Sequence, residues 1–145
     1  MVRYVISIDP GIHNCGIIIL EKNISGYDLR GEILVPVFDS AYTIFHHYTV
    51  DLHPLTTGND FNSNSIGTAV GDSVCNLLLN INGNLSSTNL HVFVEKQIKI
   101  SQNGNATLAT MGNCIVESCY TAAFEIYNVG VTPIAANTYT SRCRN

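Results

Sequence analysis

Charged residues are scarce in this sequence of 145 residues. Asp, Glu, Lys and Arg make up 12% of it, whereas hydrophobic residues make up 46%, so a disordered and highly charged segment is excluded. No apolar run reaches the roughly 18 residues of a membrane-spanning helix, and the run Val5–Ile8 is too short for a signal-peptide core. We therefore expect one domain, residues 1–145, with a single core and no contact with a membrane.

Paired cysteine motifs are also absent. The cysteines are odd in number and none has C-x-x-C spacing: Cys15, Cys75, Cys114, Cys119 and Cys143. This spacing does not support a structural zinc site or a disulfide framework. We expect reduced and mostly buried cysteines in an intracellular, cytoplasmic protein.

Basic residues are few, with seven Lys and Arg against eleven Asp and Glu and a net charge of −4. Proteins that grip duplex DNA usually present a basic face, so the balance predicts weak binding to nucleic acid. Four of the seven basic residues nevertheless follow Glu95, where they could concentrate positive charge on one side: Lys96, Lys99, Arg142 and Arg144.

Short apolar runs between turn signals predict a strand at Tyr4–Ile8, a second at Cys15–Glu21 paired with it as a hairpin, and a third at Tyr42–Leu52. The segment from Lys22 to about Ala41 is expected to be irregular because Gly and Pro interrupt it. A strand at Glu32–Phe38 remains an alternative.

Helical spacing of apolar residues predicts two helices, the first with Asn62 or Ser63 as its N-terminal cap. The later elements are helices at Ile66–Ile81 and Leu108–Ile126 and strands at Leu90–Glu95 and Val131–Ala135. The order β-β-β-α-β-α-β predicts an α/β fold with a mixed five-stranded sheet, because an antiparallel start is followed by βαβ crossovers.

Two acidic residues end apolar strands: Asp9 follows the first strand and Glu95 ends the fourth. Functional groups of an α/β sheet gather at the carboxyl ends of its strands, and neighbouring strands lie ~5 Å apart. Two carboxylates so close favour a cation between them, and hard oxygen ligands suit Mg²⁺, or Mn²⁺ as a substitute, for phosphodiester hydrolysis. Each acid alone also has an ordinary explanation, since Asp-Pro-Gly forms turns and a strand-ending Glu is often simply solvated.

The segment Val5–Gly11 resembles the opening strand motif of the RuvC Holliday-junction resolvases. Val92–Gln97 resembles their second acidic motif, and its Glu-x-Gln form is similar to the branch of poxviruses and large DNA viruses. Ser101–Asn103 and Val131–Pro133 are similar to the corresponding family segments, whereas Lys22–Leu55 resembles nothing that we can place.

This resemblance implies an RNase H-like (ribonuclease H-like) fold and a Mg²⁺-dependent endonuclease that resolves four-way or branched DNA in recombination and repair. It also implies a homodimer, since a four-way junction has two symmetric cleavage sites, and it implies that Asp9 and Glu95 are catalytic metal ligands. If the source is viral, the site of action would be the host cytoplasm.

The family carries further acids on a last helix after the fifth strand, and this sequence ends at Asn145, where that helix is expected to begin. We therefore expect a C-terminally incomplete domain that lacks the last helix and cleaves junctions poorly or not at all. Apolar residues near Val131–Ile134 should then be exposed or covered by a partner. Glu117 is the first substitute ligand to consider, before Glu125 and Asp72.

Four polar residues are candidate DNA contacts, because Lys96, Gln97 and Lys99 directly follow the second acid and Asn103 lies in the next loop. Ordinary surface side chains explain them equally well. The second helix also carries many small residues, which favours close packing on the first helix over packing on a second subunit.

Three functions remain open at this point. The first is a structure-selective endonuclease, and the second is a catalytically impaired relic or binding module of the same fold. The third is an actin-like ATPase or sugar kinase, in which Asp-x-Gly after a first strand forms a phosphate loop; those proteins are normally larger and have two domains.

Overall fold

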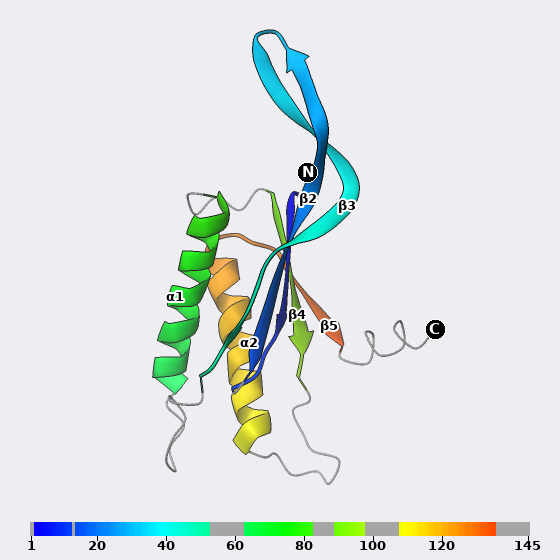
Figure 1. The fold of residues 1–145 in the computed structure, drawn as a ribbon. Helices are drawn as coiled ribbons and strands as arrows, with labels where there is room; N and C mark the ends of the chain where they lie inside the picture. Colours follow the sequence, from blue (N-terminus) through cyan, green and yellow to red (C-terminus); the bar gives the residue numbers. More distant parts are fainter. Residues whose placement is uncertain (1, 13, 53–62, 83–88, 98–107, 136–145) are drawn as a thin grey trace, which may run out of the picture.

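A computed structural model describes residues 2–12, 14–52, 63–82, 89–97 and 108–135 (Figure 1). Its elements follow the predicted order: β1 (Tyr4–Asp9), β2 (Cys15–Arg30), β3 (Ile33–Val50), α1 (Ser63–Asn82), β4 (Leu90–Lys96), α2 (Leu108–Ile126) and β5 (Val131–Ala135). Neither of these helices is both long and apolar enough to cross a membrane, within the part of the chain that the structure describes. The proposed helix cap at Asn62 or Ser63 lies outside the described side chains.

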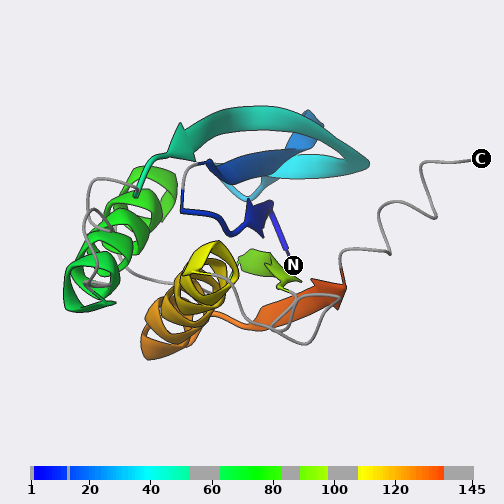
Figure 2. The ribbon, with the colours of Figure 1, turned by 90° about the horizontal axis from the view of Figure 1, so that it is seen from below.

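The five strands form one sheet in the order β3-β2-β1-β4-β5. The pairs β1–β2 and β2–β3 are antiparallel, whereas β1–β4 and β4–β5 are parallel, so the predicted mixed sheet is confirmed. Both helices lie on the same face of this sheet, and no described element covers the opposite face (Figure 2).

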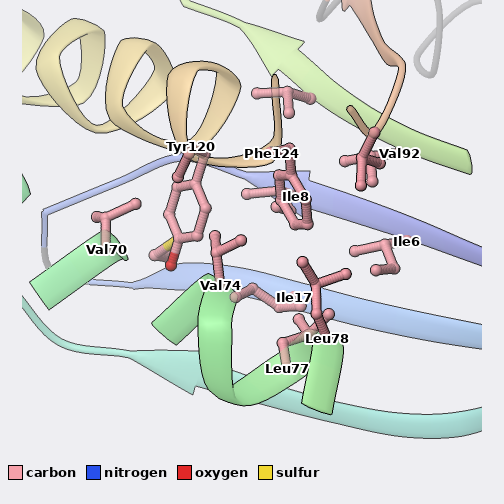
Figure 3. Close-up of a cluster of buried hydrophobic side chains, with 14 of the residues drawn as sticks. Ile6, Ile8, Ile17, Val70, Val74, Leu77, Leu78, Val92, Tyr120 and Phe124 are labelled. Carbon is pink, nitrogen blue, oxygen red and sulfur yellow. The ribbon is translucent and has the colours of Figure 1, made fainter. Parts of the chain in front are cut away.

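The core lies between the sheet and the two helices, because alternate residues of the central strands point toward the helices (Figure 3). In β1 the inward residues are Tyr4, Ile6 and Ile8, and all three are buried. Burial of one such side chain stabilises the fold by about 1.5–3 kcal/mol. The helices contribute stripes at helical spacing: Ile66, Val70, Val74, Leu77 and Leu78 from α1, and Val116, Tyr120 and Phe124 from α2.

Small residues let α1 and α2 approach each other closely. A Cβ atom on Gly67 would lie only 3.9 Å from the sulfur of Cys119, and Ala123 is buried. Cys119, one of the small residues of α2, therefore lies beside the first helix, as predicted for this face. None of the four described cysteines forms a disulfide. Only Cys15 is buried and the other three are half-buried, so the expectation that most cysteines are buried holds for Cys15 alone.

The β2–β3 pair continues far beyond the rest of the sheet as a two-stranded ribbon (Figure 1). The prediction that Lys22–Ala41 is irregular is therefore wrong, and the alternative strand at Glu32–Phe38 is part of β3. The interrupting residues are compatible with pairing for separate reasons. Gly31 forms the turn with φ of 67°, Gly26 lies at a register shift, and Pro36 lies on the outermost strand, where a missing N–H needs no partner.

The expected exposure near Val131–Ile134 is found for Pro133, whereas Val131 and Ile134 are half-buried. The side chains of Thr132 in β5 and His91 in β4 lie next to each other on the uncovered face, since Oγ1 of Thr132 is 3.0 Å from Nε2 of His91. The uncovered face therefore carries partly exposed apolar and polar side chains side by side.

Candidate active site

The ends of β1 and β4 bring Asp9 and Glu95 together. The two strands are parallel, and Ile8 pairs with Val94, so the next residue of each strand lies at the same edge of the sheet. Ile8 and Val94 are buried against the helices. Because side chains alternate along a strand, Asp9 and Glu95 point to the uncovered face.

The side chains of Asp9 and Glu95 are close enough to influence each other's surroundings. Partial burial of Glu95, its hydrogen bond with Asp9 and the negative charge of Asp9 together raise the pKa of Glu95 to about 7. Two carboxyl groups that close cannot both ionise easily unless a proton or a cation lies between them. Near neutral pH, Glu95 is therefore protonated for part of the time.

Oxygen donors held in this way fit a Mg²⁺ or Mn²⁺ ion, which takes one or two carboxylates and keeps several waters. A third His, Cys, Asp or Glu ligand is not present among the described residues, since no group of three such side chains there could hold a metal. Glu117, Glu125 and Asp72 therefore do not join the pair. The described site is a two-carboxylate site with open positions.

The turn after Asp9 is tight and tied down at its backbone. A Cβ atom on Gly11 would lie 3.3 Å from the carbonyl oxygen of Asn14, so the turn leaves little room for a side chain there. The carbonyl of Ile12 accepts a hydrogen bond from the N–H of Leu52 at 2.7 Å. The end of β1 is thus held to the residue that follows β3.

Two polar residues of α2 contact this region. Asn113 Oδ1 accepts a hydrogen bond from the N–H of Ile12 at 3.1 Å, and Glu117 Oε1 accepts one from the N–H of Gln97 at 2.6 Å. Sequence reasoning missed Asn113 and considered Glu117 only as a ligand. The sequence does contain a sign of this role. Asn113 and Glu117 are polar residues that lie next to the apolar stripe of the second helix, whereas purely solvent-exposed polar residues lie opposite such a stripe.

Comparison with known proteins gives a fold but no relative in sequence: neither a family model nor a curated protein matches. RuvC of T. thermophilus in complex with a Holliday junction substrate is similar with a TM-score of 0.58 at 16% identity, over 95% of this chain and 69% of that one. This chain has the RNase H-like fold of RuvC.

Two further solved structures agree with this RuvC-like fold. Another structure of RuvC from Thermus thermophilus has a TM-score of 0.53 at 18% identity, over 91% of this chain and 63% of that one. The yeast mitochondrial Holliday junction resolvase Ydc2 has a TM-score of 0.57 at 16% identity, over 97% of this chain and 55% of that one. The chain thus spans less than two thirds of the length of these two structures.

Two of the four candidate DNA contacts, Lys96 and Gln97, lie among the described residues. Lys96 points to the helix side and lines a cavity of about 280 Å³ together with Glu117 and Glu125. Gln97 is tied to the backbone, since its Nε2 donates to the carbonyl of Glu95 at 3.1 Å. The other two candidates, Lys99 and Asn103, lie outside the described residues.

A larger cavity of about 440 Å³ lies between β3 and α1, lined by residues such as His46, Tyr48 and Asn76. Asp9 and Glu95 line neither of these two cavities. The carboxylate pair therefore lies outside both of these cavities, at the carboxyl edge of the sheet.

Proposed function

We propose that this chain is a structure-selective endodeoxyribonuclease that acts on four-way or branched DNA with Mg²⁺, or Mn²⁺ as a substitute. The observation that carries the proposal is the placement of Asp9 and Glu95 side by side at the carboxyl ends of two neighbouring parallel strands. The RNase H-like fold shared with solved resolvases supports it, as does the position of the pair outside the two cavities described above. Neither of those cavities is a nucleotide pocket around these acids, as an ATPase or sugar kinase would need.

The residues of the chain would act in two ways: they would bind the metal ion, and they would leave room for it beside the carboxylates. Asp9 and Glu95 would hold the ion, which when bound activates a water and stabilises the charge of the phosphate. Gly16 pairs with Asp9 across the sheet and has no side chain, so it leaves the space beside that carboxylate open. Glu95 must lose its proton before it can act as a ligand.

The binding of DNA should be modest. With a net charge of −4, few phosphates can be neutralised, and the affinity should fall as salt increases because phosphate contacts release counterions. We keep Gln97, Lys99 and Asn103 as proposed contacts, whereas Lys96 would have to reach around the sheet edge. We also propose a homodimer, which would present two sites to the two symmetric cleavage positions of a junction. We propose further that the chain belongs to the poxvirus-type branch. Its role would then be recombination and repair of DNA in the host cytoplasm.

A second candidate is a binding module of the same fold that holds branched DNA without cutting it. The observation that favours it is the absence, within the described ranges, of a third acidic ligand beside Asp9 and Glu95. A two-metal hydrolase needs enough carboxylates to fix both ions and balance their charge.

The test is cleavage of a labelled four-way junction with Mg²⁺ or Mn²⁺ by the wild-type chain and by the variants Asp9→Asn and Glu95→Gln. We expect each variant to lose at least about 100-fold in cleavage rate, while junction binding stays near that of the wild type. Asp28→Asn, in the exposed ribbon, is the matched control and should cleave normally. Binding without cleavage by the wild type would favour the binding module, and cleavage that persists in both variants would contradict the proposal.

A further inference from the structure

The helix α2 carries two polar side chains next to its buried stripe. Asn113 and Glu117 are four residues apart, so they lie one above the other on the same face of the helix. The neighbouring stripe anchors α2 in the core, where Val116, Tyr120 and Phe124 are fully buried. The two polar side chains therefore project from a helix that is packed into the core.

Each of these side chains binds the backbone just after one of the two carboxylates. Asn113 Oδ1 accepts from the N–H of Ile12 at 3.1 Å, three residues after the acid of β1. Glu117 Oε1 accepts from the N–H of Gln97 at 2.6 Å, two residues after the acid of β4. One helical turn thus holds the backbone beyond both strand ends.

We propose that Asn113 and Glu117 are positioning residues that fix the spacing between Asp9 and Glu95. The two carboxylates repel each other when both are ionised, and each strand end has backbone N–H groups without a ladder partner. Binding both ends to one helix opposes their separation and keeps the acids at a distance that one cation can bridge. The consequence for metal binding rests on the proposed function, whereas the two hydrogen bonds do not.

Glu117 could instead serve as a third metal ligand, and its contacts argue against this. Its Oε1 is engaged at short distance by a backbone N–H, which is typical of a charge-assisted hydrogen bond. Within residues 2–12, 14–52, 63–82, 89–97 and 108–135 it forms no three-ligand group with Asp9 and Glu95. A variant that keeps the accepting oxygen but removes the charge separates the two roles.

The first measurement uses the full chain without metal and follows hydrogen exchange of single amides by NMR. In Asn113→Ala we expect the amide of Ile12 to exchange about tenfold faster and the amide of Gln97 to change little. In Glu117→Ala the reverse should hold, and in Glu117→Gln the protection of Gln97 should be largely retained. Both alanine variants should keep a folded α2, because alanine is the most favourable helix residue.

The second measurement is the affinity for Mn²⁺ alone, by calorimetry, in the same variants. Loss of a group that orients metal ligands typically weakens metal binding about 10- to 100-fold, and we expect this for Asn113→Ala and Glu117→Ala. Glu117→Gln should stay close to the wild type. The control is Glu125→Ala on the same helix two turns further on, which should bind Mn²⁺ normally.

The outcomes separate this inference from the proposed function. Unchanged amide protection in both alanine variants, or unchanged Mn²⁺ affinity after protection is lost, would overturn the positioning role. If Glu117→Gln loses Mn²⁺ as completely as Glu95→Gln, then Glu117 is a ligand and the inference is wrong. If the wild type itself binds no Mn²⁺, the proposed function fails, and the amide protection alone then decides whether Asn113 and Glu117 hold the strand ends.

Discussion

The helix-covered part of the sheet and the β2–β3 ribbon contain similar residues in opposite surroundings. Ile6 of β1 is 0% exposed, whereas Leu29 and Ile33 near the ribbon turn are 68% and 70% exposed. In the covered part, packing on α1 and α2 fixes which face each side chain takes. In the ribbon, regularity comes from backbone pairing and the turn at Gly31, and an isolated two-stranded ribbon is only marginally stable in water.

The two regions also lie at opposite ends of β1. Asp9 at the carboxyl end pairs with Gly16, whereas Tyr4 at the other end pairs with Glu21, after which β2 continues into the ribbon. Arg3 fastens the base of the ribbon by an ion pair with Glu21 at 3.1 Å. The carboxylates therefore lie at one end of β1, beside the helix-packed core, and the ribbon begins at the other end.

The largest expected effect is in the covered part. Ile6→Ala should lower the free energy of unfolding by about 2–5 kcal/mol, because it removes buried methyl groups and leaves a cavity between β1 and the helices. Denaturant unfolding followed by circular dichroism measures this change. A loss below about 1 kcal/mol would mean that this face of the sheet is not packed as closely as we describe.

A smaller effect, about 1 kcal/mol, is expected from pH at the carboxylate end. The pKa of Glu95 is raised from 4.5 to about 7 in the folded protein, so between these pH values the folded state binds more protons than the unfolded state. The stability of the metal-free protein should therefore fall as pH rises from about 5 to 8, by less than the full pKa shift implies because water screens the partly exposed acid.

The control for this pH dependence is a pair of variants, one in each region. Glu95→Gln should flatten the fall in stability, whereas Glu32→Gln near the ribbon turn should leave it in place. Thermal unfolding at several pH values in a chelating buffer is the measurement. A fall in stability that is unchanged in Glu95→Gln would show that another group titrates in this range.

Sequence patterns predicted the covered part well and the ribbon poorly, for a physical reason. Strand and helix periodicity reflects burial on one face, which Tyr4–Asp9 and Leu108–Ile126 both experience. Ribbon residues such as Leu34 have no buried face, so their pattern carries no such signal, and Gly and Pro there suggested an irregular segment.

The same reasoning explains which parts of the site were predictable. Asp9 and Glu95 were foreseen as neighbours because strand order and strand ends can be inferred from the chain. The two hydrogen bonds from α2 could not be foreseen, since they join residues such as Ile12 and Asn113 that are 101 positions apart. Such pairs depend on how the helix is seated on the sheet rather than on any local pattern.

A change at the ribbon turn should have an effect of similar size to that of pH. Gly31 has φ of 67° and open space around its Cα, so Gly31→Ala meets no clash but must adopt a conformation that L-residues disfavour. We expect a loss of about 1 kcal/mol in local ribbon stability, measured by hydrogen exchange of amides in residues 24–37. Asp9 and its neighbours should exchange as in the wild type, and faster exchange there would contradict the separation of the two regions.

The smallest effect is expected for Ile33→Ala, the ribbon counterpart of Ile6→Ala. Its side chain is 70% exposed, so truncation removes little buried surface and should change the free energy of unfolding by less than about 0.5 kcal/mol. The same residue type is removed in both variants, so the difference between their unfolding free energies measures packing alone. If Ile33→Ala instead costs more than about 1 kcal/mol, and the cost grows with protein concentration, the ribbon is covered by a second chain in solution and its exposure belongs only to the isolated molecule.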